Sequence, residues 1–173
     1  MTRTVLRAFA IMSVSSTLLL LYAQAAGAQP KKVTGTGKVD AALSETEMLP
    51  GDDPNHAIKL ARMSFAYTSD DPLIGNFKSS VVEVSDYTAG NGMHRGWETG
   101  LHDNGDKLFF VYDGVTKTVL KTDRAPDITF EGRWRYTGGT GRFAGITGEG
   151  TYKGQVGPAG VAWQWSGEYE IKK

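Results

Sequence analysis

Apolar and polar residues alternate with a period of two along much of the chain, which is the pattern of a β-strand with one buried face. The alternation is cleanest from Val161 to Ile171, where most odd positions are aromatic or aliphatic and most even positions are Gln, Ser or Glu. The stretch from Phe130 to Gly154 begins in the same way, with aromatic residues and glycine alternating with charged ones. It is predicted to form two strands joined by a glycine-rich corner.

Turn signals separate several more runs of this kind. The runs cover residues 58–67, 77–87, 93–102, 107–113 and 115–120. Asn91-Gly92 and Asp113-Gly114 are both strong hairpin signals, because the two central residues of such turns need positive φ. The apolar positions change parity within 58–67, which predicts a bulge near Ala61 or Arg62.

Strands at a spacing of roughly ten residues, with almost no helical periodicity, predict an all-β fold. We expect a single antiparallel closed β-barrel of about eight strands over residues 56–173, because closure removes exposed strand edges. The last strand, 161–171, is expected to pair with the first, 58–67. Residues 29–55 are polar and loosely patterned, so they are expected to form a flexible lead-in with a short helix from Asp40 to Met48.

The first 28 residues have the three-part pattern of a secretory signal peptide. Arg3 and Arg7 precede an apolar run from about Ala8 to Leu21, and small residues follow it. Cleavage after Ala28 is therefore expected, which makes the protein exported, either periplasmic or extracellular. The alternative is an uncleaved membrane anchor, for which the apolar run is short.

The amino-acid composition limits the classes of molecule that the protein is expected to bind. The chain has 19 basic and 19 acidic residues, and removal of residues 1–28 takes away two arginines and no acid. A nearly neutral chain without a Lys/Arg cluster is not expected to bind nucleic acid, nor a membrane surface after signal cleavage. The chain contains no cysteine, which excludes disulfides, a thiolate metal site and a thiol nucleophile.

The glycine-rich corner carries a family resemblance. Gly138-Gly139-Thr140-Gly141-Arg142-Phe143 resembles the corner shared by plant allene oxide cyclases and dirigent proteins, and 145–152 resembles its continuation in bacterial allene oxide cyclase-like barrels. The segment 102–111 is similar to the turn and strand that precede the corner in those bacterial proteins. The resemblance covers about the last half of the chain and implies an allene oxide cyclase-like β-barrel that often forms trimers. The catalytic residues of the cyclases match no positions here, so their activity is not carried over.

An eight-stranded barrel is just wide enough to be filled by side chains or to hold one small ligand. Aromatic residues on the inner faces of the predicted strands are the candidate lining of a ligand pocket. They are Phe65, Tyr67, Trp134, Tyr136, Trp163, Trp165 and Tyr169. The simpler interpretation, which we prefer, is that these aromatic side chains fill the core.

The third predicted strand carries polar residues on one face, namely His94, Glu98 and His102. If that face points inward, it supplies an acid and a base. Trp97 and Leu101 on the other face are the better core residues, so we expect them inside and the polar face in solvent. The spacing of the histidines supports no zinc site, Asp103 to Asp106 is predicted to be a turn and not a calcium loop, and no cofactor is expected.

Two functions fit this sequence. The first is an exported barrel that binds a small apolar molecule inside or at its mouth. The second is a cyclase or isomerase that acts on a lipid-like or polyketide-like substrate, which the family resemblance permits. Such an enzyme needs mainly a shaped cavity and one polar group, so a cavity with a buried ionisable side chain would favour catalysis, whereas a packed interior would favour a structural role.

Overall fold

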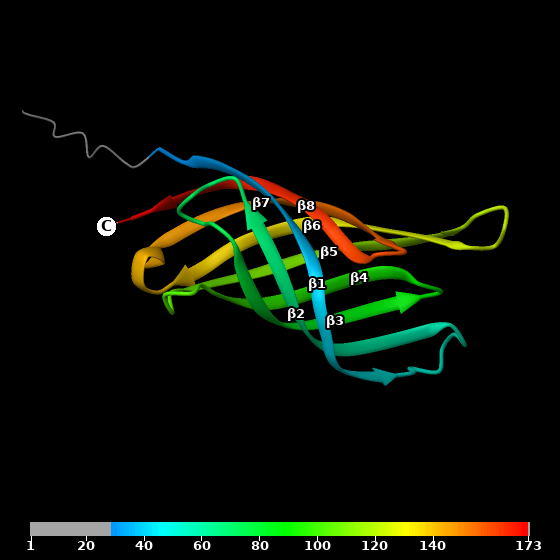
Figure 1. Cartoon of the computed structure of the whole chain (residues 1–173). Helices are drawn as coiled ribbons and strands as arrows, with labels where there is room; N and C mark the ends of the chain where they lie inside the picture. The colour runs from blue at the N-terminus through cyan, green and yellow to red at the C-terminus, as the bar shows by residue number, and fades with distance from the viewer. Residues whose placement is uncertain (1–28, 173) are drawn as a thin grey trace, which may run out of the picture.

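Eight antiparallel strands close into one barrel in the computed structural model, which describes residues 29–172 (Figure 1). The strands are β1 Lys31–Met48, β2 His56–Ser69, β3 Phe77–Thr88, β4 Asn91–Leu101, β5 Lys107–Leu120, β6 Pro126–Gly139, β7 Ile146–Gly157 and β8 Gly160–Ile171. Each strand pairs with its neighbours in sequence, and β8 pairs with β1 to close the sheet. The all-β closed barrel is therefore confirmed. The predicted signal peptide lies outside the described residues.

The first strand was missed. Residues 29–55 were expected to be a flexible lead-in with a helix from Asp40 to Met48, but β1 runs through most of this segment and pairs along both of its sides. Two interruptions of the β1–β2 register, between Val39 and Ala41 and between Ala42 and Ser44, break its alternation. The bulge predicted on residues 58–67 therefore belongs to the facing strand. The last strand accordingly closes against β1 and not against 58–67.

One predicted hairpin does not exist. The chain does not turn at Asp113-Gly114, because β5 continues through both residues to Leu120. Gly114 instead faces the barrel interior, where a Cβ would collide with the hydroxyl of Tyr152 and the backbone carbonyl of Glu131. The glycine is needed for a close approach of neighbours and not for a turn. This extra predicted strand offset the missing β1 in the strand count.

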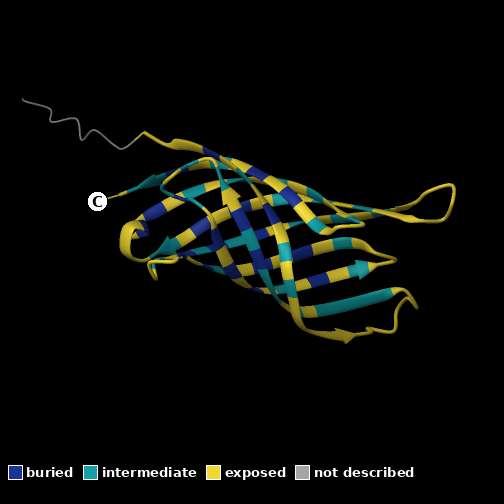
Figure 2. Ribbon diagram, in the orientation of Figure 1, coloured by how far each residue is buried: buried dark blue, intermediate teal, exposed yellow. Residues whose placement is uncertain are grey.

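The two ends of the barrel differ. The β2–β3, β4–β5 and β6–β7 connections lie at one end, where fully buried side chains from two of these connections and from the adjoining strands form a plug (Figure 2 marks buried residues in dark blue). The plug consists of Val33, Ile74, Leu108, Phe143, Ile146 and Tyr169. At the other end, on the right of Figure 1, four hairpins extend beyond the barrel and are largely exposed. We call these the closed end and the open end.

The glycine-rich corner builds the closed end. A single turn of 3₁₀ helix, η1 Gly141–Phe143, places the fully buried Phe143 ring in the plug. Gly141 and Gly145 have φ of 57° and 79°, the left-handed region in which a side chain is strained. Thr140 ties the corner to β5, since its hydroxyl accepts a hydrogen bond from the Lys107 amide at 2.9 Å. Within residues 29–172 no helix is long and apolar enough to cross a membrane.

Large rings inside the barrel lie against inward-facing glycines. The indole of Trp134 packs against Gly150 and Gly167, and those of Trp165 and Trp163 pack against Gly35 and Gly37. A Cβ at any of these glycines would collide with the ring beside it. Close packing of this kind makes the wall intolerant of even one added methyl group.

Gly167→Ala should therefore lower the free energy of unfolding by roughly 1–3 kcal/mol, because the new methyl group would meet the Trp134 ring and the Glu149 carbonyl. Gly157→Ala is the matched control, since its nearest neighbour would be 3.9 Å away. Urea unfolding of both variants measures the difference. Equal free energies of unfolding in the two variants would show that the side chains around Gly167 can shift to accept a methyl group at little cost.

Candidate functional site

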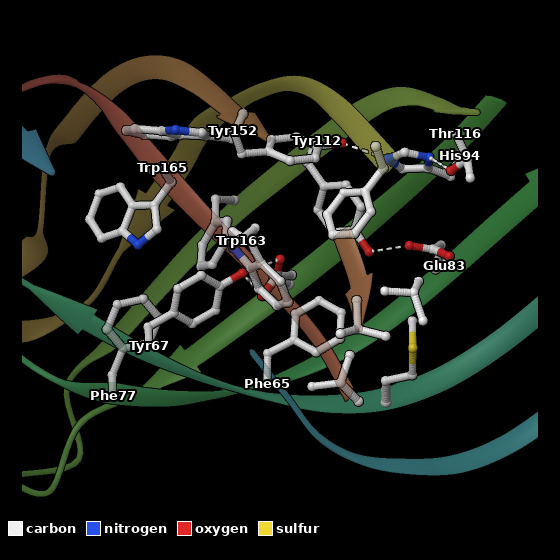
Figure 3. A pocket seen from close by; sticks show the side chains of 18 of the residues that line it. Phe65, Tyr67, Phe77, Glu83, His94, Tyr112, Thr116, Tyr152, Trp163 and Trp165 are labelled. Atoms are coloured by element: carbon white, nitrogen blue, oxygen red, sulfur yellow. Dashed lines mark hydrogen bonds between the residues drawn. The ribbon is translucent and has the colours of Figure 1, made fainter. Parts of the chain in front are cut away.

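The barrel interior is not filled. A cavity of about 240 Å³ lies above the plug and extends toward the open end, where Tyr87, Thr116 and Val156 line it. Most of its wall is aromatic, contributed by strands all around the barrel (Figure 3). The aromatic lining residues are Phe65, Tyr67, Phe77, Tyr87, Phe110, Tyr112, Phe130, Trp134, Tyr136, Tyr152, Trp163 and Trp165. Their rings hold one another mainly edge to face, as Phe65 and Trp163 do at 4.9 Å between centroids.

Six of the seven aromatic residues singled out from the sequence line this cavity. They are Phe65, Tyr67, Trp134, Tyr136, Trp163 and Trp165. The seventh, Tyr169, is not among the lining residues and lies in the plug, where its hydroxyl donates a hydrogen bond to Asp71 at 3.0 Å. Asp71 in turn accepts bonds from the amides of Leu73 and Ile74, so Tyr169 fastens the β2–β3 loop over the closed end.

Glu98 is the more deeply buried of the two acids that line the cavity. It projects from β4 and is only 5% exposed. The Tyr67 hydroxyl lies 2.9 and 3.1 Å from its two carboxyl oxygens, and the Ser79 hydroxyl lies 2.7 Å from one of them. Burial raises the pKa of Glu98 to about 8, although both hydroxyls oppose this shift. At neutral pH Glu98 is therefore mainly a neutral acid.

Glu83 is a second acid in the same cavity, nearer the open end. The Tyr112 hydroxyl donates a hydrogen bond to it at 2.6 Å (Figure 3). Burial raises the pKa of Glu83, and the nearby Glu45 carboxylate adds to the effect, while the bond from Tyr112 opposes it. The two acids thus differ in environment, since Glu83 is less enclosed than Glu98.

His94 completes the polar side of the cavity. Its Nε2 lies 2.7 Å from the Tyr152 hydroxyl and its Nδ1 lies 3.1 Å from the Thr116 hydroxyl (Figure 3). Burial lowers the pKa of His94, so the imidazole is neutral at pH 7. One ring nitrogen of a neutral imidazole donates and the other accepts, and each hydroxyl partner suits either role. His94 can therefore pass or hold a proton at the cavity wall.

The expectation that His94, Glu98 and His102 form a solvated outer face is wrong. All three are 5% exposed, whereas Trp97 and Leu101 lie outside and are 46% and 52% exposed. His102 is in the closed end and does not line the cavity. Its ring packs against Phe143 at 4.7 Å, and its Nδ1 lies 2.9 Å from an Arg142 nitrogen.

Gly96 and Gly100 explain this orientation of β4. They share the parity of Glu98, and their missing side chains leave room for the rings of Tyr112 and Phe77. Large residues such as Trp97 do not fit at these positions, so the small and polar face turns inward. Glycine inside a strand often marks a close approach, and this signal was present in the sequence.

The cavity therefore combines an apolar aromatic wall with a few groups able to exchange protons. Glu98, Glu83 and His94 differ in depth and each has at least one hydroxyl partner. Within residues 29–172 no group of three or more His, Asp or Glu residues is placed to hold a metal ion. The chemistry available from these side chains is hydrogen bonding and acid–base transfer.

No protein-family model matches this sequence, and a search of curated proteins finds no match either. The closed eight-stranded barrel agrees with the fold that the resemblance to allene oxide cyclases and dirigent proteins implies. Membership of that family remains a prediction.

Glu98 should make stability depend on pH. Its pKa is about 8 in the folded protein against an ordinary value of 4.5, so the folded state holds the proton more tightly. The stability that protonated Glu98 contributes to the folded state is then fully present below about pH 4.5 and is lost as the pH rises toward about 8. Glu98→Gln keeps the shape and cannot ionise. The variant should gain stability relative to wild type over this pH range, by an amount on the order of a few kcal/mol.

Chemical unfolding at several pH values measures this difference, with the exposed Glu168→Gln as the control. If the free energy of unfolding changes with pH in the same way in wild type and Glu98→Gln, Glu98 is not a buried, protonated acid.

Proposed function

We propose that this protein binds a small, mostly apolar molecule inside its barrel. The observation that carries the proposal is the cavity of about 240 Å³ with aromatic walls, reached from the open end. A barrel whose aromatic residues served packing alone would have no reason to keep this space. The volume lies just below the range of about 300–1,000 Å³ usual for ligand pockets, so the ligand is small. A few convergent polar groups would fix its orientation.

The second candidate is a cyclase or isomerase acting on a lipid-like or polyketide-like substrate. Glu98 favours it, because an acid kept neutral in an apolar cavity, together with the Tyr67 hydroxyl, suits stabilisation of a developing oxyanion. Glu83 or His94 would move the proton. Turnover that disappears in Glu98→Gln while binding persists would distinguish an enzyme from a binding protein.

Binding should be blocked by narrowing the cavity. Val161 lines it near the start of β8, so Val161→Phe should reduce the affinity for an uncharged aromatic probe such as tert-butylbenzene by roughly tenfold or more. Val119→Phe is the matched control, because Val119 is exposed on β5 outside the cavity. Tryptophan emission and calorimetry follow binding. No saturable binding to the wild type, or equal losses in both variants, would argue for a purely structural barrel.

We also propose that the mature protein is exported and begins near Ala26 or Gln29. The position of β1 supports this, because the strand starts at Lys31 and cleavage after Ala28 leaves the whole barrel intact. Intact-mass measurement of the protein recovered from the periplasm or medium of an expressing bacterium should show the loss of residues 1–25 or 1–28. A full-length chain extracted only with membranes would instead support the uncleaved anchor.

A further inference from the structure

Among residues 29–172 the cavity is lined by two acids and by no Lys or Arg that could neutralise an anion. The two acids are Glu83 and Glu98. His94 is held neutral by burial, which lowers its pKa. Ionised carboxylates are strongly disfavoured in such surroundings unless they are paired. A ligand with its own carboxylate would add a third acid to this space, so a free fatty acid is a poor fit.

The same wall suits a positive charge. The negative faces of aromatic rings attract ammonium groups, and cages of such rings are a common way to hold quaternary ammonium ions. Tyr67, Phe110 and Trp163 lie around the Glu98 level of the cavity, with Tyr67 5.5 Å from Trp163 and 6.0 Å from Phe110 between ring centroids. An ammonium group beside Glu98 would thus meet ring faces and a carboxylate together.

Glu98 has acceptor capacity to spare. A carboxylate offers about four lone-pair sites. Among the described residues, only two hydroxyls, those of Tyr67 and Ser79, bond to it. Glu83 receives a single hydroxyl bond, from Tyr112.

The open end is acidic on the side of these groups. The β1–β2 hairpin carries Glu45, Glu47, Asp52 and Asp53. Two basic residues offset part of this charge, since Lys59 bridges Glu45 and Glu47 and His56 bridges Asp52 and Asp86. Glu45 is close enough to Glu83 to influence its pKa. Acidic residues around an opening raise the local concentration of cations and lower that of anions.

We propose that the cavity recognises a small organic cation, an aromatic or alkyl ammonium compound, through its ring faces and the carboxyl groups of Glu83 and Glu98. This inference rests on the proposed binding function and specifies the charge of the ligand.

Binding of such a cation is coupled to the release of a proton from Glu98. Glu98 is mainly protonated at pH 7, so a cation held by its carboxylate displaces that proton. The other titratable groups facing the cavity are Glu83, His94 and the tyrosines. The tyrosines are Tyr67, Tyr87, Tyr112, Tyr136 and Tyr152, and burial raises the pKa of each. Affinity for a permanent cation should therefore rise with pH, by up to about tenfold per pH unit below the pKa of Glu98.

Three probes of the same shape test this proposal on the purified protein. Phenyltrimethylammonium, tert-butylbenzene and benzenesulfonate each join a phenyl ring to a tetrahedral head, and they differ mainly in charge. At pH 8–9 the cation should bind roughly tenfold or more tighter than the neutral probe, and the anion should not bind. Between pH 6 and 9 only the affinity of the cation should rise. Calorimetry in two buffers of different ionisation heat should show proton release.

Isosteric variants assign the effect to the acids. Glu98→Gln should reduce cation affinity about tenfold or more and remove most of its pH dependence, while tert-butylbenzene binding is kept and shows that the variant is folded. Glu83→Gln should weaken the cation less, and the exposed Glu168→Gln should change nothing. Neutral binding equal to or tighter than cation binding, binding of benzenesulfonate, or an unchanged cation affinity in Glu98→Gln would overturn the cation proposal and leave the binding function standing. Failure of all three probes to bind would overturn both.

Discussion

The width of the barrel is the constraint on which the rest of this structure depends. Eight strands enclose a space that side chains nearly fill, so a large ring on one strand fits only where a neighbouring strand has none. The chain meets this condition with inward glycines, as in the packing of Trp134 against Gly150 and Gly167. Rings that pack edge to face around the wall do not fill the centre, and the cavity is the space that remains above the plug.

The same constraint decides where the acids point. Gly96 and Gly100 must face inward to admit the rings of Tyr112 and Phe77, and the pleat of β4 then carries Glu98 inward with them. Once inside, the carboxyl group loses most of its hydration, which raises its pKa and keeps it neutral at pH 7. The site chemistry follows from packing, because one requirement for space fixes both the orientation of Glu98 and its protonation.

The sequence predicts the architecture better than its details. Period-two alternation and turn signals were enough for a closed antiparallel barrel, and inner-face aromatics identified six cavity residues. β1 was missed because bulges interrupt its alternation and because Gly35 and Gly37 occupy two of its inward positions. Asp113-Gly114 was predicted to be a turn because the sequence does not distinguish a glycine needed for close packing from a glycine needed for a turn. The prediction of which face of β4 points inward was wrong, because hydrophobicity favoured Trp97 as an inward residue. The space available inside the barrel instead favoured glycine.

Because one end of the barrel is plugged and the other is open, the surroundings of the cavity change from its mouth to its floor. The corner at Gly141–Phe143 seals the closed end. His102 directly follows β4, has the same parity as His94 and Glu98, and is buried in that seal. A molecule that approaches from the hairpin end meets the acidic β1–β2 hairpin, then Glu83 and His94, and last Glu98. Burial of the acids increases along this path, so the deepest group is the one most reluctant to ionise. A positive charge that reaches it supplies the missing partner, whereas an uncharged molecule would leave Glu98 protonated.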